Sequence, residues 1–86
     1  MTIKIKAWCK NPNDIQLQTL FVERLGRHTN RPFEVDFRFC DEKTIVQAQG
    51  RRIGPATLSK WSWILRGVER EIAEKQGAAV DPGTID

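Results

Sequence analysis

Apolar and polar residues alternate along residues 2–9 and again along residues 33–39. A period of two places successive side chains on opposite faces of a sheet, so both stretches are predicted to be half-buried β-strands. The first turns small and aliphatic side chains to one face, namely Ile3, Ile5, Ala7 and Cys9. The second does the same with Phe33, Val35, Phe37 and Phe39. Residues 44–49 predict a weaker third strand, which we expect to pair antiparallel with the second through a short turn.

Two stretches carry apolar residues at the spacing typical of an α-helix. Residues 15–25 carry apolar side chains three or four positions apart, and Gly26 is expected to end this helix. A second helix is predicted from about Ala56 to Gln76, with Gly77 as its stop. The order strand, helix, strand, strand, helix predicts a single small α+β domain, with a three-stranded sheet covered by two helices on one face.

The first two predicted strands are joined by a helix, so they are expected to run parallel through a right-handed crossover. The third strand can lie at the edge of the sheet or between the other two, and the pattern does not decide. The folded domain is expected to occupy residues 1–77. The acid-rich residues 78–86 are predicted to form a flexible C-terminal tail.

Length and composition limit the class of protein. The chain has 86 residues, of which 40% are apolar and 29% charged, so one folded domain is expected and a second core is excluded. No apolar run approaches the ~20 residues of a membrane helix, and the start of the chain lacks the apolar stretch of a signal peptide. The lack of such a run favours no membrane partner. Two cysteines, one of them in a predicted strand interior, do not suggest a disulfide scaffold and favour a reducing, cytoplasmic setting.

The net charge of +3 is unevenly distributed. Residues 51–67 contain no acidic side chain and four basic ones, namely Arg51, Arg52, Lys60 and Arg66. A local cluster of this kind attracts an anionic partner more strongly than the net charge does, because the local potential steers a phosphate backbone. The composition therefore points to nucleic acid, or to a protein complex that handles it, as the partner.

The second predicted helix places one tryptophan outside its core stripe. At about 100° per residue, one face of this helix collects Leu58, Trp61, Leu65, Val68 and Ile72. Trp63 lies on the opposite side, where its neighbours are Lys60, Arg66, Gly67 and Arg70. An outward indole among cations can stack on a base or fill a pocket of another protein. The alternative is that Trp63 packs under the first helix, the tail or a twin subunit.

The loop at residues 50–54 presents Arg51 and Arg52 between glycines, directly before the N-terminus of this helix. The free amides and the dipole of a helix N-terminus favour an anion. We therefore include both arginines in the predicted binding surface, with a solvated turn as the alternative.

A secondary binding face is predicted on the first strand, where Lys4, Lys6 and Trp8 share the side opposite the isoleucines. Sheet faces that carry aromatic and basic side chains bind single-stranded nucleic acid. If the first two strands are neighbours, Glu34 and Asp36 face the two lysines and oppose a phosphate. Cover by the tail or by a dimer partner is the alternative for Trp8.

Few residues in the sequence suggest a catalytic or metal-binding site. The two cysteines and one histidine do not complete a zinc site, and the chain contains no phosphate-binding glycine loop or nucleophile elbow. Cys9 is expected in the core, Cys40 on the outward face and His28 in solvent, although a Cys–His pair stays open. We expect a non-enzymatic protein with no cofactor and no metal site, and a small basic ribonuclease is the enzymatic alternative.

These features predict a small basic domain that binds nucleic acid through the Arg51–Arg52 loop and the outer side of the last helix. The alternative is a regulatory protein that acts by protein–protein interaction. Such an inhibitor or adaptor, of the kind that a phage or mobile element encodes, would block a host protein or nucleoprotein complex through Trp63 and its neighbouring cations. A homodimer that shares Trp63 or Trp8 is a third hypothesis.

Overall fold

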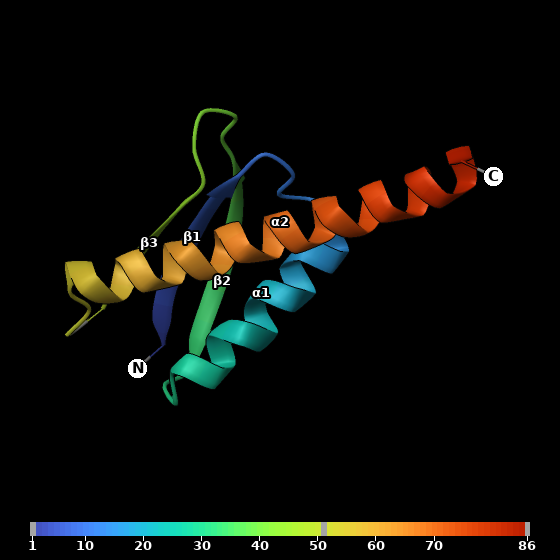
Figure 1. The fold of residues 1–86 in the computed structure, drawn as a ribbon. Coiled ribbons are helices and arrows are strands. Elements are labelled where there is room, and N and C mark those ends of the chain that lie inside the picture. The colour runs from blue at the N-terminus through green and yellow to red at the C-terminus, as the bar shows by residue number, and fades with distance from the viewer. Residues whose placement is uncertain (1, 51, 86) are drawn as a thin grey trace.

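Figure 1 shows a computed structural model of the chain, which describes the backbone of residues 2–50 and 52–85 and the side chains of this part as far as Lys75. The elements are β1 (Ile3–Cys9), α1 (Ile15–His28), β2 (Phe33–Phe39), β3 (Ile45–Gln49) and α2 (Pro55–Ile85). Both helices cover the same face of the sheet, and the other face is open (Figure 1). The predicted α+β class and element order are therefore confirmed.

The sheet has the strand order β2-β1-β3, so β1 is its central strand. As predicted, β1 and β2 run parallel, and Lys4 and Lys6 lie in register with Glu34 and Asp36. The predicted hairpin between β2 and β3 is wrong, because β3 pairs antiparallel with β1 instead. The four inward side chains of β1 are at most 1% exposed, and a central position with a strand on each side favours this burial. Burial of the most apolar strand thus decides the topology over the shorter connection.

Helix α1 begins at an Asp14 cap, whose carboxylate accepts hydrogen bonds from the amides of Gln16 and Leu17. The predicted end at Gly26 is wrong, since the helix continues to His28 and Thr29 caps it. Glycine permits a left-handed helix end but does not impose one, and no glycine in the described part of the chain has a positive φ.

Helix α2 begins at Pro55 and continues through the predicted stop at Gly77 to Ile85. The side chains beyond Lys75 lie outside the described residues, and the flexibility of the tail at 78–86 stays a prediction. Neither helix, within the part of the chain that is described, is long and apolar enough to cross a membrane.

The core lies between the sheet and the two helices. The predicted stripe on α2 is confirmed, because four of its members are buried: Trp61, Leu65, Val68 and Ile72. Phe21 of α1 packs edge-on against Phe37 of β2, with ring centroids 6.0 Å apart. Arg24 of α1 forms an ion pair with Glu71 of α2, which joins the two helices at their shared boundary. This packing fixes the rotation of α2 about its axis and therefore determines which side chains it presents to solvent.

Candidate functional site

The outer face of α2 lies outside its buried stripe, and it carries the exposed residues Lys60, Trp63, Arg66, Gly67 and Arg70. Trp63 is 65% exposed, whereas Trp61, two positions earlier, is 3% exposed. The prediction that Trp63 points outward is confirmed. An indole with most of its surface in water is unusual, since a large aromatic side chain gains more when it is covered.

Arg66 contacts the indole of Trp63 and is itself bonded to the segment before β3. Its guanidinium lies over the indole, 5.6 Å from the ring centroid, which is within cation–π range. Its Nε donates a hydrogen bond of 3.0 Å to the backbone carbonyl of Thr44, in the segment before β3. The guanidinium is therefore anchored at one of its five N–H donors and has the other four for a ligand. Because it covers one side of the indole, the opposite side is the one a partner can reach.

Lys60 and Arg70 complete the positive charge of this face. Both side chains are exposed, and neither forms an ion pair with another described residue. Glu69, an acid on the same stretch of helix, is turned toward the sheet and accepts a hydrogen bond from the Thr44 hydroxyl. Nothing lies within 4 Å of the position that a Cβ on Gly67 would take, so the helix backbone is open to close approach there.

A hollow at the N-terminal end of α2 is also lined by basic side chains and extends the positively charged region. Its polar rim is formed by His28, Arg31, Arg52 and Lys60, and no acidic residue lines it. Arg52 adopts a left-handed backbone with φ of 64°, which turns the chain from β3 toward α2. Arg51, the other predicted loop arginine, lies outside the described residues. Since Lys60 lies both on the hollow and on the outer face of α2, the two form one continuous region, which we call the basic surface.

Sequence reasoning missed Arg31 and His28 as members of this surface. His28 is the last residue of α1, and Arg31 follows this helix. Only the packing of α1 beside α2 brings the two side chains to the start of α2. The predicted exposure of His28 is confirmed. Its position in the sequence, far from residues 51–67, gives no signal that it joins their charge.

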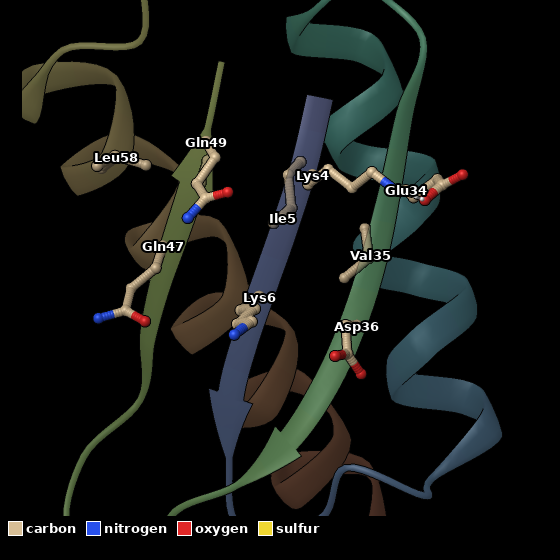
Figure 2. A pocket seen from close by; sticks show the side chains of 10 residues that line it. Lys4, Ile5, Lys6, Glu34, Val35, Asp36, Gln47, Gln49 and Leu58 are labelled. Carbon is tan, nitrogen blue, oxygen red and sulfur yellow. Dashed lines mark ion pairs between the residues drawn. The ribbon is translucent and has the colours of Figure 1, made fainter. Parts of the chain in front are cut away.

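The predicted secondary face is separate from the basic surface, because Lys4, Lys6 and Trp8 lie on the open side of the sheet. Figure 2 shows Lys4 reaching across to Glu34, and their charged atoms are 3.3 Å apart. Lys6 lies in register with Asp36, which Arg38 contacts at 2.8 Å. The acidic side chains therefore offset the positive charge of the two lysines, as the predicted strand pairing implied. This face is poorly suited to binding a phosphate backbone.

Trp8 is half-buried on the open face, and its indole N–H donates a 2.9 Å hydrogen bond to Gln47 of β3. In register it lies between Arg38 of β2 and Ile45 of β3. Its neighbours on the sheet thus account for much of its cover, and neither the tail nor a second copy is needed to explain it.

The candidate catalytic groups do not converge. Cys9 is buried, and this burial raises the pKa of its thiol to about 11, so it is a poor nucleophile. His28 lies beside Ile3 at the opposite end of β1, which at ~3.3 Å per residue is about 20 Å from Cys9. Cys40, expected on the outward face, is half-buried. Among the described residues, no three His, Cys, Asp or Glu side chains gather to hold a metal ion.

No known protein family, curated protein or solved structure matches the chain. Any function must therefore be inferred from the surfaces themselves. Compared with the open side of the sheet, the basic surface has the more exposed aromatic side chain, Trp63, and two exposed cations, Lys60 and Arg70, that form no ion pair with another described residue.

Proposed function

We propose that the basic surface binds single-stranded nucleic acid and that the protein has no catalytic activity of its own. The observation that carries this proposal is Trp63, which is 65% exposed, lies under the Arg66 guanidinium and is flanked by Lys60 and Arg70. An exposed aromatic ring in a basic groove or face is the arrangement by which proteins bind single strands. A duplex keeps its bases stacked on each other, so the indole favours a strand whose bases are free.

In the proposed complex, a base stacks on the open side of Trp63. Stacking of this kind contributes ~1–3 kcal/mol per base. The free N–H groups of Arg66 then bind a phosphate oxygen, since a guanidinium matches that geometry. Lys60 and Arg70 are ten positions apart, or about 15 Å along the helix axis, so they contact the strand on either side of the stacked base.

The hollow at the start of α2 binds the continuing strand in this proposal. Arg52 and Lys60 supply positive charge, and the first amides of the helix add partial positive charge directed at an anion. Gly67 contributes by its lack of a side chain, because the strand can approach the backbone of α2 next to Trp63.

The proposal is tested by fluorescence anisotropy with labelled single-stranded DNA and RNA at several salt concentrations. Affinity should fall steeply with salt, because each phosphate contact releases counterions. Lys60→Ala and Arg70→Ala should each lower the salt slope by about 1, and Trp63→Ala should weaken binding at every salt concentration. Lys4→Ala on the open face is the matched control and should leave the affinity unchanged. Binding to neither nucleic acid at low salt would refute the proposal.

The second candidate is a protein-binding inhibitor or adaptor that uses the same surface against a host protein. The pairing of Trp63 with Arg66, which is bonded to the Thr44 carbonyl, supports it, because Trp and Arg are enriched among the hot-spot residues of protein interfaces. A pull-down from lysate distinguishes the candidates. A partner that survives nuclease treatment and is lost with Trp63→Ala favours the inhibitor, whereas loss on nuclease treatment favours nucleic-acid binding.

Both cysteines are free, and one of them is buried. Free thiols are typical of a reducing compartment. We therefore propose that the protein works in the cytoplasm, where nucleic acid and the machinery that handles it are accessible.

A further inference from the structure

The sheet has an unprotected edge at β2. This strand pairs only with β1, and its other side has no strand partner in the described part of the chain. At its two ends the carbonyl of Pro32 and the amide of Cys40 are bonded to β1. In a parallel pair the residues that bond to the neighbour alternate, so the intervening positions present their amides and carbonyls to the free edge. These are Phe33, Val35, Phe37 and Phe39.

Exposed apolar side chains flank this same edge. The described chain has four large exposed apolar side chains, and three of them are Phe39 at 62%, Val22 at 41% and Ile15 at 77%. Arg24 marks the side of α1 that meets α2, and Val22 and Ile15 lie on the opposite flank, above the β2 edge. Of these four side chains, Trp63 on α2 is the one that lies away from the β2 edge.

The edge carries charged side chains on its open side but lacks several other features by which proteins prevent pairing. β2 contains no proline and no lysine, and its pairing with β1 runs through all seven residues without a bulge. The other edge strand, β3, has five residues and carries the polar Gln47 and Gln49 on its open side. Of the two edges, β2 is the longer one and the one flanked by exposed apolar side chains, and both features favour pairing with another strand.

We propose that β2 pairs antiparallel with β2 of a second copy of this chain, about a two-fold axis at Phe37, and joins the two sheets into one. The charges on the open side of β2 select this occupant and this register. With Phe37 opposite Phe37, Asp36 lies opposite Arg38 of the second copy, and the axis repeats the pair. A shift of one residue in either chain would also misalign the outward amides and carbonyls.

The neighbouring registers that keep the backbone bonds are disfavoured. An axis at Asp36 sets this carboxylate against its own copy, although it also brings Arg38 opposite Glu34 of the second copy. An axis at Arg38 sets that guanidinium against its own copy. Asp36 and Arg38 already form an ion pair within the chain, so dimerisation only exchanges their partners. On the helix side, Phe39 is covered by Val35 of the second copy, and Val22 approaches the joint between the sheets. The apolar flank and the alternating charges thus fit one and the same arrangement.

The first test is the sedimentation velocity of the full chain at increasing protein concentration. A concentration-dependent dimer is expected, and Phe39→Lys should abolish it, because it places a charge at the joint. Phe39 is exposed, so this variant should keep the far-UV circular dichroism of the parent. Trp63→Lys changes the one large exposed apolar side chain outside the edge and is the matched control, which should still dimerise. A monomer at all concentrations, or a dimer lost only with Trp63→Lys, would overturn the proposal.

Charge reversal tests the register itself. Asp36→Arg and Arg38→Asp should each raise the dissociation constant of the dimer by at least about tenfold, because each places like charges opposite each other twice. The double variant Asp36→Arg with Arg38→Asp restores opposite charges and should restore the dimer. Failure of the folded double variant to dimerise would refute the two-fold axis at Phe37.

Discussion

Two tryptophans on one helix, Trp61 and Trp63, have opposite environments. Trp61 is 3% exposed and packs in the core, whereas Trp63 is 65% exposed and has only the Arg66 guanidinium over its ring. The two positions are separated by about 200° around a helix, so the core that buries one necessarily turns the other to solvent. The difference teaches that the same residue type contributes to stability at one position and is available for recognition at the other.

The largest expected difference between the two is in stability. Trp61→Ala should lower the free energy of unfolding by ~3–5 kcal/mol, because it removes a fully buried aromatic side chain and leaves a cavity. Trp63→Ala should change it by no more than about 0.5 kcal/mol, as expected for a surface position. Urea unfolding followed by far-UV circular dichroism measures both. A large loss from Trp63→Ala would show that its side chain is structural after all.

Ser62 lies between the two tryptophans and sharpens the comparison. Its buried hydroxyl accepts a 2.9 Å hydrogen bond from the amide of Val46 and donates one of 2.9 Å to the carbonyl of Leu58, which ties α2 to β3. Ser62→Ala should cost ~1–3 kcal/mol, because the buried amide of Val46 loses its partner. Ser59→Ala on the exposed side is the control, and urea unfolding should show no comparable loss.

Gly67→Ala should separate stability from binding on the outer face of α2. The new methyl group meets open space, so the helix should gain about 1 kcal/mol in stability. The same methyl group lies where the proposed strand approaches the backbone, so affinity for single-stranded nucleic acid should fall. Thermal unfolding and anisotropy measured on one preparation give both values. A more stable variant with unchanged affinity would exclude close approach at this position.

The smallest effect is expected at Glu71, on the flank between the buried stripe and the outer face. The hydrogen bond from Arg24 lowers the pKa of this carboxyl below its usual value. The ion pair therefore stabilises the fold above the ordinary carboxyl pKa, and this contribution is lost as pH falls through the lowered pKa. Urea midpoints of the parent and of Glu71→Gln should differ at neutral pH and converge in acid. A constant difference across this range would contradict the assignment.

The sequence was informative wherever a pattern is local. Alternation predicted β1 and β2, helical spacing predicted the stripe around Trp61, and the same rotation predicted the exposure of Trp63. The parallel pairing of β1 and β2 also followed, because a helical crossover leaves little choice.

Features that depend on tertiary packing were not predictable. A hairpin was the shorter connection for β3, but the burial of β1 on both flanks placed β3 beside β1. The bond from Arg66 to the Thr44 carbonyl depends on that placement, as does the route of the chain to Arg52. Arg31 joins Lys60 only because α1 and α2 lie side by side, and no spacing in the sequence encodes that proximity.

The central position of β1 also has a consequence for biosynthesis. A ribosome delivers Ile3–Cys9 before either neighbouring strand, yet this segment bonds to β2 on one side and to β3 on the other. The sheet cannot be completed until Gln49 has left the exit tunnel, and the nascent strand stays open to chaperones for that whole interval. The earliest strand to be translated thus obtains its second partner only when the last strand is available.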